Sequence, residues 1–152
     1  MNKQEFKDFC HDEFTRRGFK KKRSMYYMKG KDLLCGIDLQ KSMAEAFYVN
    51  YNFYIGEYDD VKSYPSKYDC DLYHRITVWS KDTVKGEHFW DAMIEYERYT
   101  IDEIKPYFDR AFEEYIMPPI EKGKKVILEN KDFYFRGVFE YELPGLLEKL
   151  NS

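Results

Sequence analysis

The sequence predicts an α+β domain: an antiparallel meander sheet of about four strands, packed by amphipathic helices from the N-terminal half and the C-terminal half. Two strand-like runs, L-L-C-G-I-D-L-Q-K at 33–41 and F-Y-V-N-Y-N-F-Y-I at 47–55, are joined by only five residues. Apolar residues before and after this region recur every three or four positions, which is the spacing of an amphipathic helix. A length of 152 residues is typical of one domain, so we expect a single domain over 1–152.

Residues 3–17 are expected to form the first helix, because their phenylalanines recur at helical spacing. Gly18 is the expected C-cap, since glycine readily adopts the positive φ that commonly follows a helix. A first strand is expected near 24–28, and the K-G-K-D segment at 29–32 is expected to turn the chain into the next strand.

The runs at 33–41 and 47–55 are expected to pair as one antiparallel hairpin with 42–46 as its loop. Because strand side chains alternate between the two faces, this register gives one apolar face, on which Ile37 meets Tyr51. The opposite face carries amides, a carboxylate and phenols. Its expected pairs are Gln40 with Tyr48, Asp38 with Asn50, and Gly36 with Asn52. A slip of one residue would turn every core side chain toward water, so the register is strongly specified.

Residues 57–69 are expected to form a long surface loop. A fourth strand is expected at 72–79 with its even positions inward, which places Arg75 on the polar face of the sheet. The segment 83–99 has no regular pattern. We expect three of its apolar side chains to anchor it to the core: Trp90, Met93 and Ile94.

A second long helix is expected over 100–117, where T-I-D-E forms a capping box and the apolar spacing is helical. The two prolines at 118–119 are expected to stop it. The tail then carries two short apolar runs: V-I-L at 126–128, and F-Y-F at 133–135, which we interpret as strand-like or irregular; V-I-L has no assignment. A short final helix is expected over 143–150.

The composition argues against several classes of protein. A content of 43% hydrophobic and 35% charged residues is not typical of a disordered chain, and 19% aromatic residues predict a core of large rings. The three cysteines are widely spaced without a C-x-x-C pair, so neither a disulfide framework nor a zinc knuckle is expected. No segment has the length of a membrane span and the N-terminus has no apolar signal region, so we expect a cytoplasmic protein without a membrane partner.

Positive charge is concentrated near the N-terminus, although the net charge of the chain is only −3. Residues 16–31 contain eight lysines and arginines and no acid, whereas 87–121 is rich in acids. The candidate basic patch consists of Arg16, Arg17, Lys20, Lys21, Lys22 and Arg23. Two interpretations stay open: the acidic segment neutralises the basic one in the folded chain, or the basic segment binds an acidic partner or a nucleic acid, with Tyr26 and Tyr27 available to stack on bases.

Several short motifs occur together in the first half of the chain. They are G-F-K-K-K at 18–22, L-Q-K-S at 39–42, F-Y-V-N at 47–50 and the arginine-bearing strand at Arg75. With this set the chain resembles a family of bacterial domains of unknown function that are typically of about this size. The resemblance extends from the first helix to the acidic helix. It implies a stand-alone cytoplasmic α+β domain with no established activity, and it supplies almost no chemistry.

No catalytic residue, cofactor or metal site is predicted. The three histidines are scattered along the chain, which disfavours a metal site built on imidazoles. We find neither a nucleophile elbow, nor a catalytic cysteine signature, nor a glycine-rich phosphate loop. The D-L-Q-K run at 38–41 is similar to the acid and lysine element of metal-dependent nucleases, but a strand would place Asp38 and Lys41 on opposite faces.

The remaining candidate site is the polar face of the sheet. Its donors and acceptors suit recognition of a carboxylate, a phosphate or a peptide backbone. The candidate ligand-binding residues are Asp38, Gln40, Tyr48, Asn50, Asn52 and Arg75. The alternative is an ordinary solvated sheet face on which Asp38 and Arg75 form an ion pair.

Three functions therefore stay open. The leading hypothesis is a non-catalytic binding module that recognises another protein in a bacterial defence, regulatory or immunity-type setting, because tyrosine and arginine are frequent anchors at protein interfaces. The second is nucleic-acid binding through 16–31. The third, which the sequence supports least, is a metal-dependent nuclease-like or other hydrolytic enzyme that uses Arg75 with Asp38 or His74. The sequence does not determine the oligomeric state.

Overall fold

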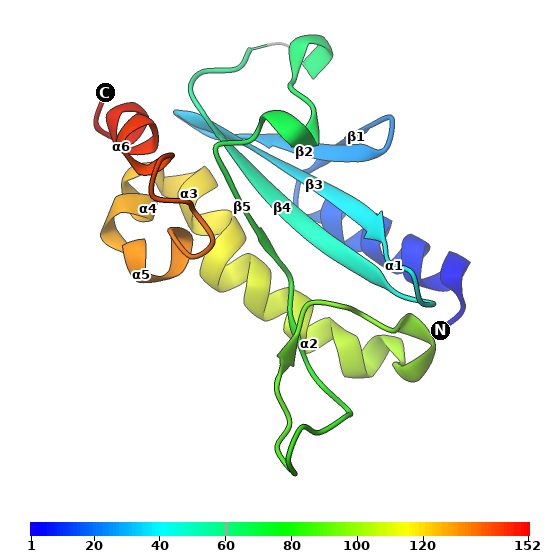
Figure 1. The fold of residues 1–152 in the computed structure, drawn as a ribbon. Coiled ribbons are helices and arrows are strands. Elements are labelled where there is room, and N and C mark those ends of the chain that lie inside the picture. Colours follow the sequence, from blue (N-terminus) through cyan, green and yellow to red (C-terminus); the bar gives the residue numbers. More distant parts are fainter. Residues whose placement is uncertain (60) are drawn as a thin grey trace.

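The computed structural model describes residues 1–59 and 61–152 and has the α+β architecture that the sequence predicts, with one antiparallel five-stranded sheet and helices from both halves of the chain (Figure 1). The strands follow one another in the order β1-β2-β3-β4-β5. Their bounds are β1 Lys20–Lys22, β2 Met25–Lys29, β3 Leu33–Lys41, β4 Phe47–Ile55 and β5 Leu72–Arg75. Each sequential pair is antiparallel, so the sheet is a meander.

The central hairpin has the predicted register, with Ile37 opposite Tyr51 and Asp38 opposite Asn50. One strand was missed. The lysines of β1 pair with β2 through a tight turn at Arg23, whose φ is +57°. Three consecutive lysines have no apolar alternation, so nothing in the local pattern indicates a strand there.

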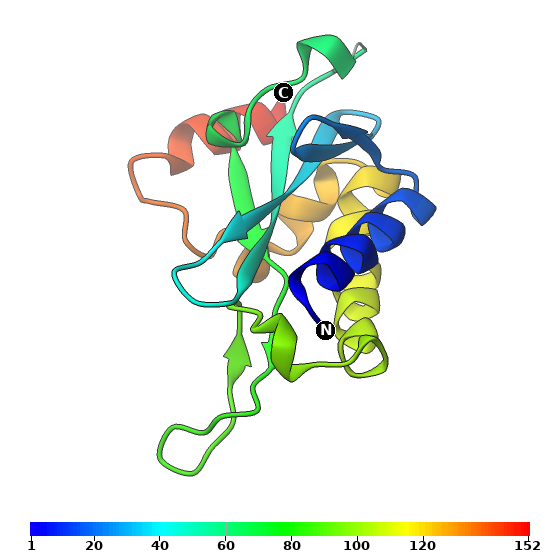
Figure 2. The same ribbon diagram turned by 90° about the vertical axis from the view of Figure 1, so that its right-hand side faces the viewer.

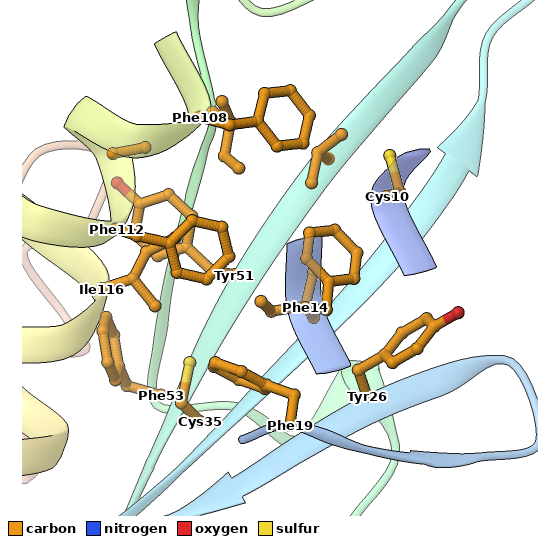
Figure 3. Packing of buried hydrophobic residues seen from close by; sticks show 14 of the residues in the cluster. Cys10, Phe14, Phe19, Tyr26, Cys35, Tyr51, Phe53, Phe108, Phe112 and Ile116 are labelled. Atoms are coloured by element: carbon orange, nitrogen blue, oxygen red, sulfur yellow. The ribbon is translucent and has the colours of Figure 1, made fainter. Parts of the chain in front are cut away.

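Two helices lie side by side on one face of the sheet: α1 (Lys3–Arg16) and α2 (Ile101–Ala111) (Figure 2). Each begins with a capping box, which Asn2 supplies for α1 and Thr100 for α2. Between the helices and the sheet lies the core of large rings that the composition predicts. In Figure 3, Phe14 of α1 and Phe108 of α2 meet the side chains of β4.

The second helix does not stop at Pro118 and Pro119, which corrects the prediction. A π-helical turn, η4 (Phe112–Ile116), follows α2 and leads directly into α3 (Met117–Lys122). The prolines occupy the first turn of α3, directly after the π turn, and neither has a backbone N–H to donate to that turn. The helical run ends at Gly123, whose φ is +100°.

The tail is helical over most of both apolar runs, so the strand-like or irregular interpretation of F-Y-F at 133–135 is wrong. The runs lie mainly in α4 (Lys125–Glu129) and α5 (Lys131–Tyr134). The predicted final helix is confirmed as α6 (Leu143–Asn151). Short apolar runs are compatible with either a buried strand or a helix, and only the fold decides between them.

The predicted fourth strand is interrupted after Arg75. A separate hairpin, β6 (Val78–Trp79) with β7 (Trp90–Asp91), projects away from the body of the molecule (Figure 2). Trp90 is 47% exposed and is not the core anchor that we predict, whereas Ile94 is fully buried and pairs with Phe47. None of the described helices combines the length and the apolar character needed to cross a bilayer.

Candidate functional site

The outer face of the sheet, opposite the helices, contains a buried polar network. The Asp38 carboxylate accepts hydrogen bonds from the amide groups of Asn50 (3.0 Å) and Asn52 (2.9 Å). Asn52 also donates to the carbonyl oxygen of Gly36, at 3.1 Å. Asp38, Asn50 and Asn52 are each at most 6% exposed. These three predicted site residues therefore lie together, but they bind one another and are closed to solvent.

Arg75 joins this network at its rim. Its Nε donates to Asn50 Oδ1 at 3.0 Å, and its guanidinium lies 4.1 Å from the ring centroid of Tyr48. Among the described residues Arg75 forms no ion pair with Asp38, because Asn50 lies between them and bonds to both. The amide of Asn50 also donates to Gln40 Oε1, at 3.0 Å. The network thus fixes the position of Arg75 without neutralising its charge.

The outer face is covered over one half only. Residues 64–70 cover that half, where Tyr27 donates to the carbonyl oxygen of Pro65 (2.6 Å) and Tyr54 donates to that of Ser66 (2.9 Å). The open half carries the other predicted residues, Gln40, Tyr48 and Arg75, together with Tyr73, which is 52% exposed. The accessible part of the predicted site is therefore the part nearest β5.

A groove of about 680 Å³ runs beside β5. One wall is β5 itself, with Tyr73 and Arg75 at its rim. The other wall comes from α2 through Arg110, from η4 through Tyr115, and from the segment at 133–142. The groove is the largest of the described cavities, and it joins three parts of the chain that are distant in sequence.

Stacked rings line the groove. Phe133 stacks on Tyr115 with centroids 3.9 Å apart and on His74 at 4.7 Å. His74 Nε2 lies 2.9 Å from the carbonyl oxygen of Tyr134, so we assign the proton to Nε2, which donates to that oxygen. Burial lowers the pKa of His74 below its ordinary value of 6.5, so the imidazole is neutral near pH 7.

Three arginines line the groove: Arg75, Arg110 and Arg136. Arg136 lies 4.4 Å from the Phe133 centroid, and Arg110 lies 4.4 Å from that of Trp90. Arg75 and Arg136 have no acidic partner among the described residues, and Arg110 has one loose contact of 3.5 Å with Glu114.

Both acids that line the groove form hydrogen bonds within the protein. Asp71 pairs with Lys149 at 2.6 Å, and Glu142 accepts from the backbone N–H of Phe139 at 3.2 Å. The groove consequently presents more positive than negative charge to a ligand.

Sequence reasoning missed Arg110, Tyr115, Phe133 and Arg136. Along α2, Tyr107 and Arg110 are three residues apart beside the apolar stripe, and this spacing could have indicated an aromatic and cationic face. No local pattern places Phe133 or Arg136 there, because their position depends on how the helices of the tail pack.

The basic segment is partly neutralised, as one of the two interpretations held. Arg17 contacts Asp109 at 2.6 Å, and Arg16 contacts Glu13 at 2.6 Å. Lys105 from α2 contacts both acids, at 3.2 and 3.0 Å. The hydrogen bonds of Lys105 with Glu13 and of Arg17 with Asp109 tie α1 to α2.

The rest of the basic segment is less engaged. Lys20, Lys21 and Arg23 are exposed, and Lys22 is half-buried. Tyr26 and Tyr27 are 6% and 5% exposed, so the prediction that they are available to stack on bases is wrong. Both rings are committed to the protein interior, where Tyr26 packs against Phe14 and Tyr27 against Tyr64.

The geometry also bears on the hydrolytic hypothesis. Asp38 lies on the outer face, whereas Lys41 pairs with Phe47 at the other face, so the two side chains do not converge. The described residues contain no group of three or more histidines, cysteines or acids arranged to hold a metal ion.

Comparison with known proteins gives one match. A family model described as "Domain of unknown function (DUF4304)" matches residues 10–122. No curated protein and no solved structure matches. The matched range contains the sheet and the helices from α2 to α3, and it ends before α4. It therefore includes β5 and the α2 wall of the groove, and it excludes the wall formed by 133–142.

Proposed function

This chain belongs to the DUF4304 family, and because the description of that family names neither a ligand nor a reaction, we propose from its own surface that the protein is a non-catalytic binding module that recognises another protein. The observation that carries this proposal is the position of Arg75. It is held by Asn50 and stacked on Tyr48, and it is free of acidic partners among the described residues, at the border between the open half of the sheet and the groove.

Pre-positioned arginine and tyrosine side chains are well suited to anchor a protein partner. They supply large contact areas and directed donors, and a side chain that is already ordered loses less entropy on binding. Tyr48, Tyr73 and Arg75 together give such a surface, since Arg75 lies 4.1 Å from the ring centroid of Tyr48 and 6.0 Å from that of Tyr73. The buried network beneath supports it, which is the role we assign to Asp38, Asn50 and Asn52.

The same contacts weigh against the hydrolytic alternative. Both carboxylate oxygens of Asp38 already accept amide donors inside the protein, and His74 uses Nε2 on a backbone carbonyl. A general acid or base must be within hydrogen-bonding reach of the reacting group, and Asp38 is buried away from the open surface.

Nucleic-acid binding through 16–31 receives less support from the structure than from the sequence. The two arginines at its start are held by Glu13 and Asp109, and its tyrosines are buried. The proposal includes that this binding takes place in the cytoplasm of a bacterium. The three cysteines are free, which is usual in a reducing compartment. A defence, regulatory or immunity-type setting stays a prediction.

Partner capture with matched surface variants tests the proposed function. The full chain is immobilised and exposed to native cytoplasm treated with nuclease, and bound proteins are quantified. We expect one protein in stoichiometric amount on the wild type and on Arg98→Gln, whose arginine is paired with Asp82 at a distant surface. The double variant with Tyr48→Ala and Arg75→Gln should lose it. Capture of no protein, or equal capture by all three proteins, would contradict the proposal. Capture that occurs only in a parallel sample without nuclease would favour nucleic acid instead.

A further inference from the structure

We propose that the groove binds an extended, acidic segment of the partner protein, which adds to β5 as a sixth strand of the sheet. The inference rests on the proposed function and specifies the chemistry of the partner. Its three supports are the free edge of β5, the space beside that edge, and the guanidinium groups around it, which have few acidic contacts among the described residues.

The first support is the backbone of β5. β5 is the last strand of the sheet, and among the described strands it pairs only with β4. The N–H of Ile76 donates to Val49, and antiparallel strands alternate the direction of their backbone groups. The N–H and C=O groups of Tyr73 and Arg75 therefore point to the free edge. Such an edge is a template for another strand.

The two edges of the sheet differ in this respect. The opposite edge, β1, consists of Lys20–Lys22, and charged lysines on an edge strand oppose pairing with another chain. β5 has the sequence L-Y-H-R and contains no lysine. Strand addition is therefore favoured at β5 and opposed at β1.

The second support is space. The groove of about 680 Å³ lies directly beside this edge, between β5 and the wall of α2, η4 and residues 133–142. An extended segment that pairs with the four residues of β5 would be about 13 Å long at 3.3 Å per residue. Its alternate side chains would point into the groove, where the rings of Tyr115 and Phe133 can cover their apolar parts.

The third support is charge. The alternate side chains of an added strand would meet Arg110 and Arg136 on the groove side and Arg75 on the outer side. Guanidinium groups bind carboxylates through two parallel hydrogen bonds. Glutamate or aspartate at alternate positions shares one face of a strand, and on the groove side it matches Arg110 and Arg136. A second copy of this chain fits poorly, because a symmetric β5 pair would bring the same three arginines together.

A synthetic probe tests the inference. The probe is a capped peptide of alternating glutamate and threonine, about eight residues long. We expect it to bind the full chain and to protect the amides of Tyr73 and Arg75 from hydrogen exchange. The double variant with Arg110→Gln and Arg136→Gln should weaken binding about tenfold or more, whereas Arg98→Gln should not change it.

Two further comparisons isolate the backbone pairing. Two peptides are methylated on the backbone nitrogens of every second residue, one at the odd positions and one at the even positions. Methylation should abolish binding in the peptide whose methylated N–H groups face β5 and spare it in the other. Tyr73→Pro removes the outward N–H and should weaken binding more than Tyr73→Ala, which keeps it. Circular dichroism of each variant confirms that the chain is folded.

The inference is overturned if a peptide with lysine in place of glutamate binds equally well, if methylation at the odd and at the even positions has the same effect, or if exchange protection falls outside β5. Binding of oligothymidine in preference to the peptide would overturn it as well. These results are separable from the proposed function. If the variants at Tyr48 and Arg75 abolish partner capture while the acidic peptide does not bind, strand addition alone is wrong, whereas absence of any captured protein removes the proposed function itself.

Discussion

Two groups of arginines in this molecule have opposite surroundings. The ion-pair cluster consists of Glu13, Arg16, Arg17, Lys105 and Asp109, and joins the end of α1 to α2 through contacts of 2.6 to 3.4 Å. The arginine groove consists of Arg75, Arg110 and Arg136, whose only acidic contact among the described residues is the 3.5 Å approach of Glu114 to Arg110. The first group holds the fold together, and the second leaves its positive charge available.

The difference teaches that charge density along the sequence is a poor guide to charge available for binding. The dense basic run at 16–31 attracts attention first, yet the two arginines at its start are bound by acids from α1 and α2. The arginines of the groove are separated by 25 or more positions and are brought together only by the packing of β5, α2 and the tail. An isolated arginine next to an aromatic ring can contribute more to the recognition of a partner than a run of lysines does.

The largest effect is expected at the centre of the ion-pair cluster. Glu13→Ala should destabilise the folded chain by about 2 to 3 kcal/mol. Glu13 is only 4% exposed, and its removal deprives the half-buried Arg17 of one of its acidic partners. Urea denaturation measures the change. Glu5→Ala, at an exposed position of the same helix, is the control for loss of a helical glutamate, although it also removes part of a capping box. A change under about 0.5 kcal/mol for Glu13→Ala would show that the cluster is not structural.

The same cluster should make stability depend on pH. Burial by itself would raise the pKa of Glu13, but hydrogen bonds from Arg16 and Lys105 hold it below the ordinary value of 4.5. Burial would likewise raise the pKa of Asp109, but hydrogen bonds from Lys105 and Arg17 hold it below 3.8. A carboxyl whose pKa is lower in the folded chain stabilises it above the unfolded value and loses this effect as the pH falls through the folded value.

The free-energy difference between the wild type and Glu13→Gln should therefore be largest near pH 6 to 7 and shrink toward pH 3. Denaturation midpoints measured at several pH values check this. A difference that is constant over this range would mean that the charge of Glu13 contributes nothing.

The sheet could be predicted from the sequence because a period of two is unambiguous when one face is apolar. The register of β3 and β4 and the outward position of Arg75 follow from that alternation alone. The ion pair between Asp38 and Arg75 could not be excluded in the same way, because both lie on one face. Only the coordinates show that Asn50, directly opposite Asp38, occupies the space between them.

The groove was beyond prediction for a different reason. Its second wall depends on α5 and on a helical run that passes through Pro118 and Pro119 by way of a π turn. Three-residue apolar runs such as V-I-L do not distinguish a helix from a strand, so the tail had no reliable assignment from which Arg136 could be placed. Tertiary packing, and not local propensity, creates this site.

The smallest effect is expected in the groove, and it gives the direct contrast with the cluster. Arg17→Gln should cost about 1 to 2 kcal/mol, because its guanidinium bonds Asp109 and lies 4.2 Å from the Phe112 ring centroid. The same substitution at Arg136, whose only hydrogen bond among the described residues is a 3.3 Å contact with a backbone carbonyl, should change stability by less than about 0.5 kcal/mol. Urea denaturation of the two variants measures both values. If Arg136→Gln proves as costly as Arg17→Gln, the groove arginines serve the fold, and the distinction between a structural and a binding group of arginines fails.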